Sequence, residues 1–170
     1  MTSQTLQTPT QNQVTKMVAT IDRFPGFMKT WALSKAFGTV IPYAGRAKIR
    51  VETLNHHECV VTLANRRKVQ NHIGTLHAAA MALVAESATG FLVGMNVPKD
   101  KVPVIKELGV AFHKRTSGGI QAKAHLTDDQ IQQMQTQEKG EVIVPVTVTD
   151  AEGKEPVECR MVWAWTPKRR

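Results

Sequence analysis

The most constraining feature of the sequence is a long apolar helical pattern, residues 74–95, that carries one acid. The stretch NHIGTLHAAAMALVAESATG (residues 71–90) places Glu86 among small and apolar residues. Side chains recurring at steps of three and four residues predict a helix with a core-facing stripe. The members of this stripe are Ile73, Leu76, Ala80, Leu83, Ser87 and Phe91. Alanines cover most of the remaining surface and allow another backbone or a ligand to approach closely. We therefore expect a central, largely buried helix.

Six segments of alternating apolar and polar residues surround this helix in the sequence. Turn compositions join the first two segments, then the third to the fourth, and the fifth to the sixth, which favours strands linked mostly by hairpins. A short polar helix, with Thr127 or Asp128 as its N-cap, is expected between the fourth and fifth. The fold class is therefore α+β, with the apolar helix packed on one face of a curved antiparallel sheet. The six predicted strands are residues 46–54, 57–65, 104–115, 120–126, 142–149 and 157–165.

The chain divides into three parts by composition, and its 170 residues suit one globular domain. Residues 1–12 are rich in Thr and Gln without an apolar period, which predicts a disordered leader. Residues 13–42 form a helical N-terminal extension of two helices, which Pro25 and Gly26 separate. Residues 43–170 form the main domain. The N-terminus lacks the pattern of a secretory signal, so a cytoplasmic location is expected.

Charge and composition narrow the classes of function. The net charge of +8 favours an anionic partner or a solvated basic surface. Aromatic residues make up only 5% and no nucleic-acid reading motif is present, which argues against nucleic-acid binding. The apolar helix is interrupted by Glu86, Gly90 and Gly94, so we expect no stable membrane insertion.

The cysteine and histidine patterns do not suggest a metal site. Cys59 and Cys159 each lie in an alternating apolar pattern, which suits small buried hydrophobic residues better than a disulfide or metal ligands. His56 and His57 fall beside a tight turn with no complementary ligand cluster. We therefore expect no metal and no cofactor.

The acid in the helix allows two interpretations. Glu86 is either a solvated or ion-paired carboxylate, or a catalytic base or nucleophile that small apolar neighbours partly desolvate. His77 is likewise either a structural residue or a base. The amides that follow it lack partners within the helix and lie at the positive end of its dipole, so they can form an oxyanion hole. Ala78 and Glu86 lie about 12 Å apart along the helix axis. If both act in one reaction, the site is shared between two chains.

The order of these residues resembles the signature of the hotdog-fold acyl-CoA thioesterases. Asn71, then His77, then small residues and an acid nine positions beyond the histidine are similar to the pattern of the phenylacetyl-CoA type, which has Asn, His-Gly-Gly and Asp. Residues 84–87, Val-Ala-Glu-Ser, resemble the Leu-Ala-Glu-Ser context of a 4-hydroxybenzoyl-CoA type. The resemblance covers residues 46–166. It implies a hotdog fold, in which a curved antiparallel sheet of about six strands wraps around one long central helix.

The resemblance also implies an activity and roles for the residues. Glu86 would activate water or attack the thioester carbonyl directly, and the Ala78 amide of the facing subunit would polarise that carbonyl. Asn71 would help to position the water or the thioester, and His77 would orient the helix entrance. The substrate would be an acyl-CoA or a related thioester, and the enzyme would be a homodimer or a dimer of two such dimers. The residues implied in substrate binding are Gly74, Ala79 and Ser87.

One departure from the family pattern keeps other functions open. Ala78 and Ala79 stand where the family usually has two glycines, and their methyl groups lie where the thioester must pass. The alternative is therefore a non-catalytic acyl-CoA-binding or regulatory hotdog protein. A third class, a peripheral membrane or partner-docking protein, would use the basic amphipathic segment 16–37. Its aromatic residues are more consistent with covering the sheet edge or an acyl tunnel; they are Phe24, Phe27, Trp31 and Phe37.

The family also suggests where the phosphates of CoA would bind. Basic residues follow the helix or lie on the next strand, where family members tend to bind the nucleotide end. Ordinary solvated charge at a strand edge is an equally good interpretation of each of them. These basic residues are Lys99, Lys101, His113, Lys114 and Arg115.

Overall fold

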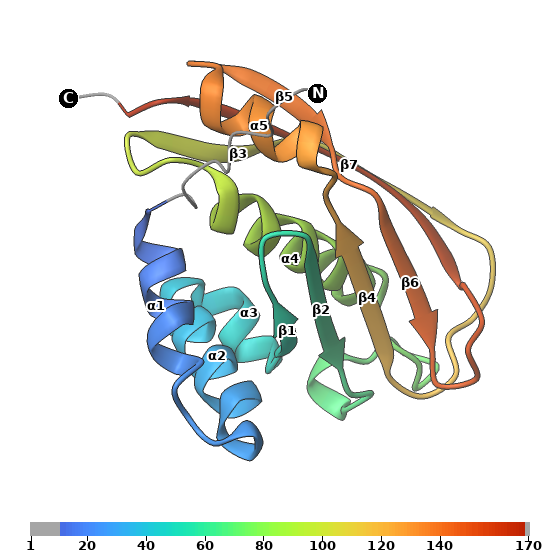
Figure 1. Cartoon of the computed structure of the whole chain (residues 1–170). Helices are drawn as coiled ribbons and strands as arrows, with labels where there is room; N and C mark the ends of the chain where they lie inside the picture. Colours follow the sequence, from blue (N-terminus) through green and yellow to red (C-terminus); the bar gives the residue numbers. More distant parts are fainter. Residues whose placement is uncertain (1–10, 169–170) are drawn as a thin grey trace, which may run out of the picture.

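A single long helix, α4 (Ala78–Asn96), runs through the centre of the protein, and strands curve around it (Figure 1). The computed structural model describes residues 11–168. Twelve of the 19 residues of α4 are buried, which explains its nearly uniform apolar composition. By length and composition α4 could cross a membrane, but it is mostly buried inside the protein, as a core helix is.

The sheet is antiparallel and falls into two hydrogen-bonded sections. The first section has the order β1-β2-β4-β6 and the second has the order β3-β7-β5. In β2, Cys59, Val61 and Leu63 are buried while the residues between them are partly exposed, so one face of the strand packs on the core. This arrangement is α+β and is the expected hotdog fold. The strands are β1 (Arg50–Leu54), β2 (Glu58–Leu63), β3 (Lys101–Phe112), β4 (Ile120–His125), β5 (Gly140–Ile143), β6 (Val146–Asp150) and β7 (Val157–Pro167).

Three helices form the N-terminal extension and lie beside β1 at one edge of the sheet (Figure 1). The second and third helices touch backbone to backbone, because a Cβ atom on Gly45 would lie 2.3 Å from the carbonyl oxygen of Gly38. This close approach requires glycine at residue 45. The extension comprises α1 (Gln13–Ile21), α2 (Gly26–Val40) and α3 (Pro42–Ala47).

Two shorter helices connect strands. The polar helix α5 (Asp128–Thr136) has Thr127 as its N-cap, which confirms one of the two predicted caps. At the other end of α5 the buried Lys101 ammonium donates to the carbonyl oxygens of Met134 at 3.0 Å and Gln137 at 2.7 Å. Lys101 therefore caps a helix. A 3-10 turn, η1 (Arg67–Val69), precedes the loop that leads to α4.

Within residues 11–168 the sheet has seven strands, where the sequence predicts six. Residues 142–149 divide at Pro145 into β5, which pairs with β7, and β6, which pairs with β4. Proline has no amide hydrogen to donate to a ladder, so the chain changes partners there. The prediction of hairpin links was also wrong for most strands. β1 and β2 pair directly, but β3 and β4 belong to different sections, as do β6 and β7.

The first strand and the central helix both begin later than expected. Strand β1 begins at Arg50, because α3 continues to Ala47 and Lys48 ends it in a left-handed conformation. Helix α4 begins at Ala78, four residues after the predicted start at residue 74. The residues before it form a hydrogen-bonded loop. Ile73 in that loop is 48% exposed, so its assignment to the core stripe was wrong.

Two features of the structure lie at the predicted boundaries of the leader and of the helical extension. Asn12, placed in the leader by its composition, caps α1 by accepting from the Thr15 amide at 2.9 Å. Its side-chain amide also donates to the carbonyl oxygens of Gly94 at 2.9 Å and Val97 at 2.7 Å, at the end of α4. These hydrogen bonds hold the Asn12 side chain against the end of α4. Residues 1–10 of the predicted leader lie outside the described residues. Helix α3 begins at Pro42, the last residue of the predicted extension.

Candidate active site

Glu86 lies midway along α4 on the side of the helix that the rest of the chain covers least. Ala82, Glu86, Gly90 and Gly94 follow one another at steps of four residues, and each is partly exposed. One turn further along α4, the Trp163 indole packs so closely against Gly90 that a Cβ atom there would lie 2.7 Å from the ring. The single chain therefore leaves a narrow stripe of small residues open around one carboxylate.

The environment of Glu86 favours its protonated form. Its half-buried carboxyl group forms no hydrogen bond or ion pair with another residue between 11 and 168. Desolvation by burial raises the pKa of Glu86 above its ordinary value of 4.5. A carboxylate that is poorly solvated and has no partner is a stronger base than one in water. This is the chemical condition for proton transfer at Glu86.

His77 holds the start of the helix. It is the N-cap residue of α4, and its Nδ1 atom accepts a hydrogen bond from the Ala79 amide at 3.0 Å. Because Nδ1 is an acceptor, the neutral ring carries its proton on Nε2. The side chain is exposed, so that Nε2–H group is accessible. His77 thus lies where the sequence placed it, at the helix entrance.

The amide of Ala78 is the open donor of the first turn. The next three amides are occupied: Ala79 donates to the His77 ring, and Ala80 and Met81 donate to the His77 carbonyl at 2.9 and 3.1 Å. Within residues 11–168 the Ala78 amide has no acceptor, and the residue is exposed. A free amide at the positive end of a helix can stabilise a negative oxygen.

Asn71 organises the loop before the helix. Its Oδ1 atom accepts from the amides of Ile73 at 3.0 Å and Thr75 at 3.2 Å. Its side-chain amide donates to the Thr75 hydroxyl at 2.8 Å. Gly74 has a φ of +79°, a conformation that other residues rarely adopt. In this structure Asn71 and Gly74 shape the loop, and the polar atoms of Asn71 have partners there.

Ser87, beside Glu86, is buried with its hydroxyl unpaired. It is 2% exposed, and no described residue is within hydrogen-bonding distance of Oγ. A buried hydroxyl without a partner costs about 1–3 kcal/mol. The substrate-binding role of Ser87 stays a prediction, because the described chain covers its hydroxyl.

Within one chain the predicted residues form two separate groups. Asn71, Gly74, His77, Ala78 and Ala79 lie together at the entrance of α4. Glu86 and Ser87 lie about 12 Å further along the helix, eight residues after Ala78. The single chain does not bring the acid to the free amide, as the helical spacing predicts.

A hollow of about 780 Å³ adjoins the helix entrance. It includes cationic residues of the extension and of η1 that the sequence analysis did not single out. The basic runs RAKIR (residues 46–50) and RRK (residues 66–68) could have indicated them, because both precede the motif and the second lies close to it. By contrast, Lys101 from the predicted phosphate-binding set is the buried cap of α5, and His113 pairs with Glu158 at 3.4 Å. Residues lining the hollow include Tyr43, Arg46, Lys48, Lys68, His77 and Ala79.

Comparison with known proteins identifies a family. A family model described as "Domain of unknown function (DUF4442)" matches residues 29–165. The chain belongs to this family. The match begins within α2 of the DUF4442 protein and ends near the end of β7, so it includes both groups of site residues. No curated protein sequence matches the chain.

Several solved structures similar to this DUF4442 protein are described as thioesterases or probable thioesterases. A protein of unknown function from Pseudomonas aeruginosa, described as a probable thioesterase, is 24% identical, with a TM-score of 0.70 over 77% of this chain and 91% of that one. A thioesterase family protein from Silicibacter pomeroyi is 14% identical, with a TM-score of 0.62 over 79% and 96%. A thioesterase from Haemophilus influenzae is 13% identical, with a TM-score of 0.61 over 74% and 82%. These likenesses establish the fold. The resemblance to the phenylacetyl-CoA and 4-hydroxybenzoyl-CoA types stays a prediction.

Proposed function

We propose that this protein is a homodimeric acyl thioester hydrolase that acts on acyl-CoA. The observation that carries the proposal is the carboxyl group of Glu86, which is partly desolvated, lacks a partner among the described residues and faces the open stripe of α4. The thioesterase-family neighbours support the reaction class. The free Ala78 amide supplies the second chemical element, a donor for the carbonyl oxygen.

In the proposed reaction, the Ala78 amide of the partner subunit polarises the thioester carbonyl. Glu86 takes a proton from water as the water oxygen attacks the carbonyl carbon, or attacks that carbon itself to give an anhydride that water then hydrolyses. The negative charge on the carbonyl oxygen is stabilised by the amide at the helix start. Collapse of the tetrahedral intermediate breaks the carbon–sulfur bond. The thiolate receives a proton, which leaves the free acid and the thiol.

The free edge of β3 supports a dimer. This strand lies at the end of the β3-β7-β5 section, so one side of it is paired with β7 and the other is open in the described chain. A long apolar edge strand is a template for pairing with another chain. Pairing with a second copy by a twofold axis would bring the two α4 helices near each other. The exposed apolar residues of β3 are Val102, Val104, Ile105, Leu108 and Phe112.

A pair of inactive variants tests whether the site is shared between subunits. Ala78→Pro removes the free amide, and proline is well tolerated at the first position of a helix. Loss of one oxyanion donor lowers kcat about 10²- to 10³-fold. Glu86→Gln removes the acid. Each homodimer is then inactive, but a mixed dimer retains one complete site if Glu86 acts with Ala78 of the partner subunit.

The measurement is thiol release after the two variants are unfolded together and refolded as an equimolar mixture. Recovery of about a quarter of wild-type activity is expected, because half of the dimers are mixed and each has one intact site of two. Ala78→Gly, which keeps the amide, is the matched control and retains activity. If the mixture stays inactive although mixed dimers form, the two groups do not act across the interface.

A non-catalytic acyl-CoA-binding protein is the second candidate. The observation in its favour is that Ala78 and Ala79 place methyl groups at the exposed helix start. The pattern of the hotdog acyl-CoA thioesterases has two glycines there. A panel of acyl-CoA thioesters separates the candidates by thiol release and thermal shift. Turnover supports the hydrolase, whereas stabilisation without turnover supports the binding protein.

A further inference from the structure

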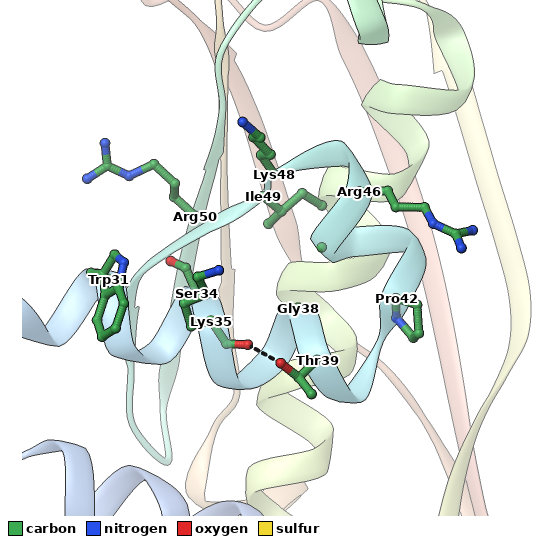
Figure 2. Close-up of a pocket in the computed structure, with 11 residues that line it drawn as sticks. Trp31, Ser34, Lys35, Gly38, Thr39, Pro42, Arg46, Lys48, Ile49 and Arg50 are labelled. Atoms are coloured by element: carbon green, nitrogen blue, oxygen red, sulfur yellow. Dashed lines mark hydrogen bonds between the residues drawn. The ribbon is translucent and has the colours of Figure 1, made fainter.

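A second hollow continues from the one at the helix entrance. It measures about 660 Å³ and lies between α2, α3 and β1 (Figure 2). Gly45, Arg46 and Lys48 line both hollows, so the two adjoin at these residues. A ligand that reaches from the start of α4 past α3 would therefore occupy both. Each hollow has a volume within the range of small-molecule sites, about 300–1,000 Å³.

The second hollow is strongly cationic. Lys35, Arg46, Lys48 and Arg50 line it, and its described lining contains no carboxylate. Arg50 is paired with Glu52 at 3.4 Å, whereas Lys35, Arg46 and Lys48 have no ion-pair partner among residues 11–168. Cations gathered in a concave surface without acids attract an anion, and phosphate groups are the anions that Lys and Arg bind best.

An exposed indole stands beside these charges. Trp31 is 60% exposed and lines the hollow. Figure 2 shows Trp31 and Arg50 at one end of the hollow, Arg46 projecting at the opposite end and Lys48 between them. A flat aromatic ring next to phosphate-binding side chains can stack against a nucleobase. The hollow thus offers an aromatic ring for a nucleobase and several cationic side chains for phosphates.

Lys48 occupies a conformation that favours glycine. Its φ is 56° and its ψ is 45°, which is the left-handed region, and it ends α3 with its amide donating to the Gly45 carbonyl at 3.0 Å. Glycine would adopt this conformation without steric cost. Backbone strain of this kind concentrates at functional sites. Here the strained residue carries a charge at the junction of the two hollows.

We propose that this second hollow binds the nucleotide end of CoA. The adenine stacks on Trp31, and the phosphates bind Lys48 with Lys35 and Arg46. The pantetheine arm then passes along the first hollow and brings the thioester to the helix entrance, a path that rests on the proposed hydrolase function. This location is on the N-terminal extension, away from the basic residues after α4 that the family resemblance suggested.

Binding to the full chain tests the proposal without relying on catalysis. Isothermal titration calorimetry would measure the affinity of CoA and of adenosine 3′,5′-bisphosphate. Lys48→Gly is expected to weaken both at least about fivefold, and Trp31→Ala about tenfold. Because Lys48→Gly also relieves the backbone strain, its melting temperature is expected to rise by about 2–4 °C. Lys139→Ala, at an exposed lysine between α5 and β5, is the matched control and keeps wild-type affinity.

A kinetic comparison separates this proposal from the proposed function. With Trp31→Ala, which changes only the second hollow, KM for an acyl-CoA is expected to rise about tenfold, while kcat and the KM for the matching acyl-pantetheine thioester, which lacks the nucleotide, stay unchanged. If the wild-type protein hydrolyses no thioester, the hydrolase proposal fails and the binding measurement still stands. Equal affinity of Lys48→Gly and wild type for both nucleotides, or an equal loss with Lys139→Ala, overturns the nucleotide site.

Discussion

Two carboxyl groups of this protein are displaced in opposite directions from their ordinary pKa. Asp150, at the end of β6, accepts hydrogen bonds from the amides of Ser117 at 3.0 Å, Lys154 at 3.0 Å and Glu152 at 2.9 Å. The Ser117 amide is the largest cause of the lowered pKa of Asp150. Glu86 has no such donors, and burial raises its pKa. Hydrogen bonds from backbone amides stabilise the ionised form of Asp150, whereas burial makes the ionised form of Glu86 a stronger base.

The largest expected effect is the loss of turnover in Glu86→Gln. Removal of a general base lowers kcat about 10²- to 10⁴-fold. The neutral amide avoids the desolvation cost of the carboxylate, so the melting temperature is expected to stay the same or rise. Thiol release and thermal unfolding measure the two quantities. Glu138→Gln, at an exposed acid after α5, is the control and changes neither. An unaltered rate in Glu86→Gln would remove this acid from the mechanism.

The pH dependence of activity follows the ionisation of Glu86. Only the carboxylate accepts a proton or attacks the thioester, so kcat is expected to fall about tenfold for each pH unit below its raised pKa. The apparent pKa in the rate profile is expected above 4.5, the ordinary value for Glu. A profile that stays flat through this range contradicts the assigned role.

Stability responds to pH in opposite ways at the two carboxyl groups. The desolvation cost of Glu86 is fully present above its raised pKa, so its contribution to the free energy of unfolding improves as the pH falls through that value. The favourable contribution of Asp150 is fully present above 3.8 and is lost as the pH falls through its lowered pKa. Unfolding of Glu86→Gln and Asp150→Asn against pH would measure each contribution by difference from the wild type.

Asp150→Ala is expected to affect stability and leave the chemistry intact. Three backbone amides lose their acceptor, which is expected to lower the melting temperature by about 5 °C. The kcat of the folded protein stays at the wild-type value, because the turn holds none of the proposed reacting groups. Thermal unfolding and thiol release, both at neutral pH, test this. A large fall in kcat would show that Asp150, like Glu86, affects the reaction itself.

The smallest expected effect is that of Ser87→Ala. Because no described residue is bonded to the Ser87 hydroxyl, removing it is expected to raise the free energy of unfolding by up to about 1–3 kcal/mol. If the hydroxyl binds the substrate, KM or kcat worsens about threefold to tenfold. Denaturant unfolding measures the effect on stability, and steady-state kinetics measure the effect on KM and kcat. A clear loss of stability with normal kinetics would assign Ser87 to the core.

Local sequence patterns predicted the parts of the site that depend on neighbours in the chain. The helix, its acid and the position of His77 at the entrance follow from spacing along one segment. Features made by distant residues were not predictable in this way. Lys101 caps α5 through a carbonyl 33 residues away. The change of partners at Pro145 and the cationic hollow at Lys48 also depend on how separate segments pack, which no periodicity in the sequence reports.

The order of strands has a consequence for how the polypeptide is made. Strand β7 is the middle strand of its section, with β3 on one side and β5 on the other, and it follows both of them in the sequence. Neither neighbour can pair within that section until residues 157–167 have been synthesised. Folding of the β3-β7-β5 section therefore waits for β7, and translation that stops before residue 157 would expose two unpaired strands to quality control.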